Sequence, residues 1–404
     1  MGNKQTRETA TSTSVDGNVT RQDRLEKIRE SVSASFSATS LGSVSSGRST
    51  CSASRPWSRV SRRRWKESTL TLPYESSKTA WPVTQTESSF LPEFPITATH
   101  NEKRFELVKE VSKGAFGKVY KVNDLEREQS FALKVLSKSK VIKDNSVQQV
   151  KDEVQIQKLC GHHPFIVDCP LHWQSRKRLY IVTDFVNGGE LYDLLKAYVT
   201  FPTELVKLYV AQIALALDFL HNAGVIYRDL KPENVLLDDD GNVQLIDFGL
   251  SKWLRHGATT KTICGTLRYM APEILELQPY NHAVDWWSLG VLACLMLTNK
   301  YPGGTIDEST KTYRGQKPGT LPTSVDLDVP SKDLLMRLLE IEPTKRLRSL
   351  RTLQTIAFYK DYNFDHVKEK MIKPKELLMQ FYPNGPPKNE DFYPDFDELM
   401  SVEV

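Results

Sequence analysis

The sequence predicts an α+β fold of two lobes, strand-rich then helical, with a disordered segment before them and a tail after them. Residues 1–100 are about one-third Ser and Thr and carry little apolar surface to bury, which is typical of disorder. From Phe105 onward apolar residues alternate as in strands, and apolar runs separated by turn signals continue to about residue 360. A stretch of that length can bury a substantial core.

Charge and cysteine usage exclude several classes of protein. The 404 residues carry a net charge of +4, but residues 1–100 carry +5 and the remainder −1, which argues against a nucleic-acid-binding protein. The five cysteines form no C-x-x-C pair, which excludes a disulfide scaffold or a zinc cluster and suits a reducing compartment. The longest apolar run, Leu289–Leu297, is too short to span a bilayer and predicts a buried helix. With no secretory pattern at the start, we expect a cytoplasmic protein.

A glycine pair lies between two of the expected strands, within Val111–Val119. Glycine lets a backbone approach phosphate oxygens, although such a pair is more often a simple turn. Seventeen residues after Gly117, Lys134 interrupts an apolar, strand-like run. A lysine facing a sheet core needs a partner. Glu153, in the helical stretch Gln148–Leu159, is the candidate, and a lysine pointing to water is the alternative.

Three further polar motifs follow in a fixed order. Tyr227–Leu237 reads YRDLKPENVLL, Asp247–Gly249 reads DFG, and Ala271–Glu273 reads APE. Each alone could be a loop. Together, in this order and at these spacings, they match the protein-kinase signature.

That match implies phosphoryl transfer, which depends on positioning and on stabilising anionic oxygens. ATP and Mg²⁺ are the implied cofactors, and serine or threonine residues of proteins are the implied acceptors. Lys134 would hold the α- and β-phosphates, and Glu153 would fix its ammonium group. Asp247 and Asn234 would ligate the metal ions. Asp229 would accept the proton of the substrate hydroxyl, and Lys231 would lie near the γ-phosphate.

The chain resembles the AGC group of serine/threonine kinases, and within it the ribosomal protein S-six kinase branch. Tyr227-Arg-Asp, His162–Val167, Gly188–Leu191, Thr262–Glu273 and Asp285–Gly290 carry the resemblance. It implies a disordered segment 1–100, a kinase domain 101–361 with lobes 101–186 and 187–361, and an AGC-like tail 362–404. The nucleotide would be bound by Ser112, Gly114, Ala115, Gly117, Val119, Lys134, gatekeeper Thr183, hinge residues Asp184 and Val186, and Glu190.

Regulation is implied by position. Thr262 matches the activation-loop threonine that an upstream AGC kinase phosphorylates, with Arg228 and Lys252 placed to receive the phosphate. Phe396 and Asp397 resemble a hydrophobic motif that docks on the small lobe and supports the Glu153 helix, with Asp397 replacing the usual phosphorylated residue. A merely acidic tail is the alternative. The last 45 residues are predicted to form an extended tail that packs on another surface, because its own aromatic residues, such as Phe381, would otherwise be exposed.

Some positions depart from the family pattern. Ser112 stands where the first glycine of the loop is expected, which would lower nucleotide affinity. Met296 stands where relatives carry a glutamate for a basic substrate residue, while Glu190 and Glu233 remain. The stretch Gly303–Pro322 replaces a substrate-docking helix. Arg346 is placed to pair with Glu273.

The N-terminus fits a membrane tether. Met1–Thr6 matches the myristoylation pattern M-G-x-x-x-[ST], with Gly2 as the acylated residue. One such chain binds membranes only marginally, so a second signal is needed. Arg55–Lys66, with six positive charges and two tryptophans, could contact an anionic membrane. A solvated charge run or a nuclear-import signal is the alternative.

The leading hypothesis is an active serine/threonine kinase, monomeric and peripheral to a membrane. A pseudokinase-like scaffold and a membrane adaptor are the alternatives from other classes. The complete set Lys134, Glu153, Asp229, Asn234 and Asp247 favours the enzyme.

Overall fold

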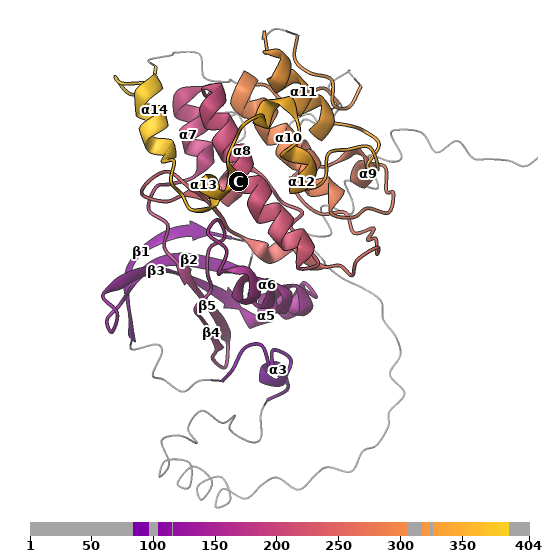
Figure 1. Cartoon of the computed structure of the whole chain (residues 1–404). Coiled ribbons are helices and arrows are strands. Elements are labelled where there is room, and N and C mark those ends of the chain that lie inside the picture. The colour runs from indigo at the N-terminus through magenta and orange to yellow at the C-terminus, as the bar shows by residue number, and fades with distance from the viewer. Residues whose placement is uncertain (1–83, 97–103, 115, 305–316, 324–325, 388–404) are drawn as a thin grey trace, which may run out of the picture.

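The computed structural model describes residues 84–96, 104–114, 116–304, 317–323 and 326–387. Four predicted features lie outside these residues: the acylation site Gly2, the basic run Arg55–Lys66, Ala115, and the tail motif with Phe396 and Asp397. Figure 1 shows a sheet-rich lobe below a helical lobe, as the sequence predicts.

The small lobe is built on an antiparallel five-stranded sheet of order β1-β2-β3-β5-β4. Strands β2 and β3 pair without interruption, whereas β1 and β2 shift register twice, between Leu107 and Lys109 and between Glu110 and Ser112. Such bulges increase the local twist of a strand. The strands are β1 (Phe105–Lys113), β2 (Gly117–Asp124), β3 (Gln129–Ser137), β4 (Leu171–Gln174) and β5 (Arg178–Asp184).

Two helices of the small lobe, α5 (Lys138–Lys143) and α6 (Val147–Cys160), pack beside this sheet. Val141, Val150 and Val154 from these helices share a buried cluster with residues of β3 and β5. Helix α6 is the one predicted from Gln148 to Leu159, longer by one residue at each end.

The large lobe is organised around α8 (Thr203–Asn222) and α10 (Ala283–Thr298). All residues of α10 are buried, which confirms that the apolar run Leu289–Leu297 is a core helix. Among the described residues, further helices follow or flank this pair, including α7 (Leu191–Tyr198), α9 (Pro272–Leu275), α11 (Val329–Leu338), α12 (Leu350–Leu353) and α13 (Phe364–Lys368). No helix in the described ranges is long and apolar enough to cross a bilayer.

Short elements at the junction of the lobes carry the polar motifs. Strands β6 (Val225–Ile226) and β9 (Lys252–Trp253) pair with each other, as do β7 (Val235–Leu237) and β8 (Val243–Leu245). Within the part of the chain that the structure describes, 3-10 helices form at Pro232–Asn234, Phe248–Leu250, Leu267–Tyr269 and Ala357–Tyr359.

Two expectations about the chain ends need correction. The disordered segment was expected to reach residue 100, but residues 84–96 form helix α3 (Gln85–Ser88) and bury Phe90 and Phe94 completely. These two aromatic side chains are enough to order the segment, because the small lobe provides an apolar surface on which they pack. After residue 361 the chain forms α13 and α14 (Pro374–Phe381) against α8, and Phe381 is 49% exposed rather than covered.

Candidate active site

Lys134, Glu153 and Asp247 meet where the two lobes join. Lys134 on β3 places its Nζ 2.6 Å from Glu153 Oε1 on α6 and 3.5 Å from Asp247 Oδ1. Burial alone would lower the pKa of Lys134, but the two carboxylates outweigh it and hold that pKa above its ordinary value. The charge of Lys134 in turn lowers the pKa of Asp247. The predicted Lys134–Glu153 pair is therefore present, and a fixed ammonium faces the junction of the lobes.

Asp247 follows β8 in a left-handed conformation, with φ of 54°. Its Oδ1 accepts a hydrogen bond from the Gly249 backbone N–H at 3.3 Å. A Cβ on Gly249 would stand 3.1 Å from Asp247 Oδ1 and 3.6 Å from Glu153 Oε2, so a side chain would crowd both carboxylates. Between them Phe248 is fully buried against Tyr227, at a ring-centroid distance of 5.3 Å. The burial of Phe248 thus anchors the DFG motif, and the lack of a side chain at Gly249 leaves room for the carboxylates of Asp247 and Glu153.

Asp229 is held at both carboxylate oxygens. Asn234 Nδ2 donates to Oδ2 at 2.8 Å and to the Asp229 carbonyl at 2.9 Å, and Thr266 Oγ1 donates to Oδ1 at 2.8 Å. Lys231 Nζ lies 3.3 Å from Asp229 Oδ2 and donates to Thr266 Oγ1 at 3.1 Å. Asp229, Lys231 and Asn234, predicted as one site, therefore form one network, with Thr266 from the activation segment as a further member.

Asp285 anchors the loop that carries Asp229, a role that sequence reasoning missed. Its carboxylate is fully buried and accepts from the backbone N–H groups of Tyr227 at 2.9 Å and Arg228 at 2.7 Å. Arg228 has a φ of 72°, an unusual conformation for a side-chain-bearing residue. His221 Nε2 completes the set at 2.7 Å. An acidic residue at the start of an apolar helix was the available signal, but its partners lie 57 and more residues away in the chain.

The glycine-rich hairpin joins β1 to β2. The Gly114 N–H donates to the Gly117 carbonyl at 2.9 Å. A Cβ on Gly117 would lie 1.8 Å from the Val135 carbonyl oxygen, so only glycine fits against β3. Ser112 pairs with Val119 at the end of β1, so a serine is accommodated in the ladder.

The other residues predicted to contact nucleotide lie along the same junction. Strand register places Val119 opposite Lys134, and Thr183 opposite Ala132. Asp184 ends β5, and Val186 lies in the link that leads into α7. Glu190 is the residue before α7, and burial, with the charges of Asp193 and Glu233, raises its pKa.

The activation segment links Thr262 to two basic residues through intermediate side chains. Thr262 is exposed, and its Oγ1 lies 3.4 Å from Thr260 Oγ1, which accepts from Lys252 Nζ at 2.9 Å. Arg228 donates to the Leu250 carbonyl at 2.6 Å and contacts Tyr280, whose hydroxyl donates to the Thr262 carbonyl. Lys252 thus reaches the threonine two positions before the predicted one, and Arg228 is connected to Thr262 through Tyr280.

Met296 does not belong to this surface. Its side chain is fully buried within α10, so this position offers no carboxylate to a basic substrate residue, in line with the departure noted in the sequence. In the stretch Gly303–Pro322, the Gly303 N–H donates to Thr320 at 2.7 Å and Gly319 donates back at 2.9 Å, which ties together its two described ends.

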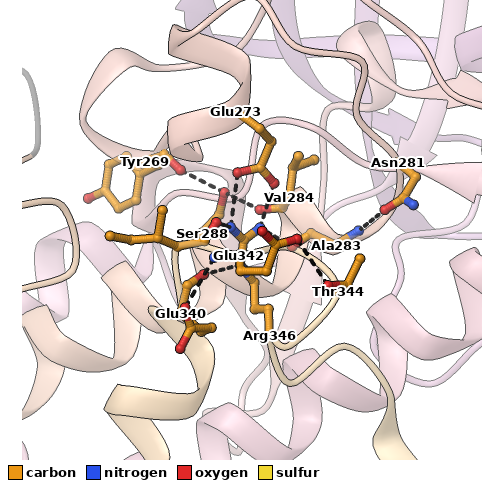
Figure 2. A network of polar contacts seen from close by, with 11 residues as sticks. Tyr269, Glu273, Asn281, Ala283, Val284, Ser288, Glu340, Glu342, Thr344 and Arg346 are labelled. Atoms are coloured by element: carbon orange, nitrogen blue, oxygen red, sulfur yellow. Dashed lines mark hydrogen bonds and ion pairs between the residues drawn. The ribbon is translucent and has the colours of Figure 1, made fainter.

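The predicted Arg346–Glu273 pair is present and fully enclosed. Figure 2 shows the guanidinium of Arg346 surrounded by acceptors from several segments. Its nitrogens donate to Glu273 Oε1 at 2.6 Å and Oε2 at 2.9 Å, and to the carbonyls of Glu340 at 2.8 Å, Ala283 at 3.0 Å and Ile341 at 3.2 Å. Five donors thus meet five acceptors. The pair fastens the end of the activation segment to the large lobe.

A lysine–glutamate pair from the small lobe, set over a loop that carries an aspartate and an asparagine, defines a phosphoryl-transfer enzyme of the protein kinase class. A profile of the protein kinase domain matches residues 105–357, and the chain belongs to this family.

Relatives agree with this assignment. The chain is 40% identical to the human ribosomal protein S6 kinase-related protein over 285 residues, which cover 70% of this chain and 69% of the relative. It is 36% identical to chicken serine/threonine-protein kinase Sgk1, over 73% of this chain and 68% of the relative. It is also 36% identical to the cAMP-dependent protein kinase catalytic subunit of Dictyostelium discoideum, over 72% of this chain and 44% of the relative.

The expected family, two-lobed fold and serine/threonine kinase function are therefore confirmed. Membership of the family implies ATP, a divalent metal ion and protein substrates. The comparisons give no support to the alternative of a pseudokinase scaffold.

Proposed function

We propose that the chain transfers the γ-phosphate of ATP to serine or threonine residues that follow basic residues in protein substrates, with Asp229 as the base. The observation that carries this proposal is the network around Asp229, whose two oxygens are held at 2.8 Å each by Asn234 and Thr266. A carboxylate fixed at hydrogen-bonding distance from the attacking hydroxyl is what proton acceptance requires.

Lys134 and Lys231 supply the positive charge that phosphoryl transfer needs. Lys134 is held by Glu153 at 2.6 Å, so its ammonium is oriented before nucleotide binds. Lys231 lies 3.3 Å from Asp229 Oδ2, close to where the transferred phosphoryl group would pass. Electrostatic groups that are already in place need no reorganisation during the reaction.

The donor set at Asp247 and Asn234 fits magnesium. Among the described residues, no three side chains of His, Cys, Asp or Glu lie close enough together to hold a metal ion. Magnesium in phosphoryl-transfer enzymes instead takes one or two protein oxygens and completes its shell with phosphate and water. Asp247 is 50% exposed and contacts Lys134 and Gly249 only through Oδ1, and Asn234 turns its amide nitrogen to Asp229. Asp247 Oδ2 and Asn234 Oδ1 are the atoms that would hold the ion, which would neutralise phosphate charge when bound.

A group of carboxylates supports the preference for basic substrates. Glu190 has Asp193 and Glu233 as neighbours, and its burial together with the charges of these two carboxylates raises the pKa of Glu190. Such a group attracts a cationic side chain, and Glu233 is two residues from Lys231.

The test is γ-phosphate transfer by the purified full-length chain to a library of serine and threonine peptides, beside Asp229→Asn. Asp239→Asn, an exposed aspartate in the turn after β7, is the matched control. We expect transfer by the parent and the control, loss in Asp229→Asn, and enrichment of arginine or lysine before the acceptor. Transfer that persists in Asp229→Asn would refute the role of the base.

Regulation and membrane attachment form a second part of the proposal. Phosphorylation of Thr262 by an upstream kinase would add negative charge beside Arg228 and Lys252, and Tyr280 couples this site to the Asp229 loop. Acylation of Gly2 together with Arg55–Lys66 would tether the chain to an anionic membrane. Vesicle flotation of the full chain and of Gly2→Ala tests the tether, and equal flotation of both would count against it.

A further inference from the structure

A segment that precedes the kinase domain is built into the small lobe. The family match begins at residue 105, yet residues 84–96 pack against α5, α6 and β4 (Figure 1). Ile96 forms a parallel bridge with Gln174 on β4, and the Gln174 N–H donates to the Pro95 carbonyl at 3.0 Å. The last residues of the segment therefore lie along the edge strand of the sheet, after the residues that pack on the helices.

Two aromatic side chains fix this segment. Phe90 and Phe94 are fully buried and meet edge to face at a centroid distance of 6.3 Å. They belong to one cluster with Val141 on α5 and with Val150 and Val154 on α6. Phe94 also packs on His172 at 5.8 Å. The two rings thus fill the space between helix α6 and the sheet.

Polar contacts hold the same segment along α6. Lys151 Nζ donates to the Leu91 carbonyl at 2.8 Å and lies 2.9 Å from Glu93 Oε2. Gln155 Nε2 donates to Glu93 Oε1 at 3.0 Å. The side-chain amide of the fully buried Gln174 donates to the carbonyls of Glu87 at 3.1 Å and of Phe94. Together these polar contacts join the segment to α6 and β4 at several points along its length.

The contacts lie on the helix that carries Glu153. Positions 150, 151, 154 and 155 form one stripe along α6, because residues three and four apart share a helix face. Glu153 lies outside this stripe and turns to Lys134. A helix this short and polar is marginal by itself, so packing decides where it sits. The segment is on one side of α6 and the Lys134 pair is on the other.

We propose that residues 84–96 are an intramolecular activating segment, in which Phe90 and Phe94 are positioning residues that hold α6 so that Glu153 meets Lys134. This inference rests on the proposed function, because the Lys134–Glu153 pair matters only if phosphate is transferred. Because the segment belongs to the same chain, no partner protein is needed to cover the surface formed by α5, α6 and the sheet.

The experiment compares the full-length chain with the double variant Phe90→Ala/Phe94→Ala. Phe381→Ala, the same substitution at an exposed phenylalanine, is the matched control. A misplacement of about 1 Å in a catalytic group can lower the rate about 100-fold, so we expect a loss of that order in kcat/KM for the double variant. A synthetic peptide of residues 84–96 should restore activity, and the same peptide with both phenylalanines replaced should not.

A double-mutant cycle separates positioning from a general loss of stability. If the rings act through Glu153, the double variant should cause little further loss in a Glu153→Gln background. Hydrogen exchange across residues 147–160 should rise in the double variant and fall again with the peptide. Glu93→Ala leaves both phenylalanine rings in place and should lower kcat/KM by a smaller factor. It serves as a folded variant if the double variant does not fold.

The outcomes are distinct. Full activity of a folded Phe90→Ala/Phe94→Ala chain, a loss that adds fully to that of Glu153→Gln, or a failure of peptide rescue would overturn the inference. Absence of transfer by the parent chain would instead defeat the proposed function.

Discussion

Replacing Glu273 by alanine should destabilise the large lobe by about 3–5 kcal/mol, the cost of removing one partner from a buried ion pair. The side chain of Arg346 is 0% exposed and that of Glu273 is 7% exposed. The substitution leaves a buried guanidinium with two of its five donors unpaired (Figure 2). Unit charges about 4 Å apart attract by about 4 kcal/mol at the effective dielectric of a protein, which agrees with that range.

The assay is urea unfolding followed by tryptophan fluorescence. The guanidinium of Arg346 lies 5.1 Å from the ring centroid of Trp287, so the local environment reports on the loss of the pair. With a slope of about 3 kcal/mol per M, the midpoint should fall by about 1–2 M. Circular dichroism should give the same midpoint, since a two-state treatment requires agreement between probes.

Glu276→Ala is the control, because Glu276 lies three residues further on and is exposed. It should shift the midpoint little, as surface substitutions usually do. Arg346→Met should cost more than Glu273→Ala, because it also strands the carbonyls of Glu340, Ala283 and Ile341. A loss below about 1 kcal/mol for Glu273→Ala would show that the enclosed pair is not anchoring the lobe.

Three further predictions concern the site and its pH range. Gly117→Ala should raise the KM for ATP, because the added Cβ would lie 1.8 Å from the Val135 carbonyl oxygen. Gly114→Ala is the control and should raise the KM less, because a Cβ at Gly114 would have no atom within 4 Å. Asp285→Asn should lower kcat while leaving binding of an ATP analogue intact, since it weakens only the anchor of the catalytic loop; equal losses in both would contradict this. Burial lowers the pKa of His163 to about 4 from 6.5, so protonation favours the unfolded chain, and the stability present above pH 6.5 should be lost as the pH falls toward 4. His163→Leu should flatten that dependence in urea titrations, and an unchanged slope would refute it.

The sequence was informative wherever function demands particular residue types at fixed spacing. The Lys134–Glu153 pair, the Asp229–Asn234 network and the DFG turn were predicted from the order of motifs, and the structure brings each set together. The buried helix α10 followed from its apolar run alone. The partners of these groups were harder to predict, since Asp285 and Thr266 reach the catalytic loop from remote segments.

The sequence by itself therefore determined the class of fold and the chemistry of the site, because both are encoded in local patterns and short motifs. Only the tertiary structure decided that Phe381 stays exposed and that residues 84–96 are part of the small lobe. Phe90 and Phe94 stand in a polar, Ser/Thr-rich stretch whose composition predicts disorder. Their burial depends on an apolar surface formed by helices and strands that come later in the chain, and no local pattern reports the shape of that surface.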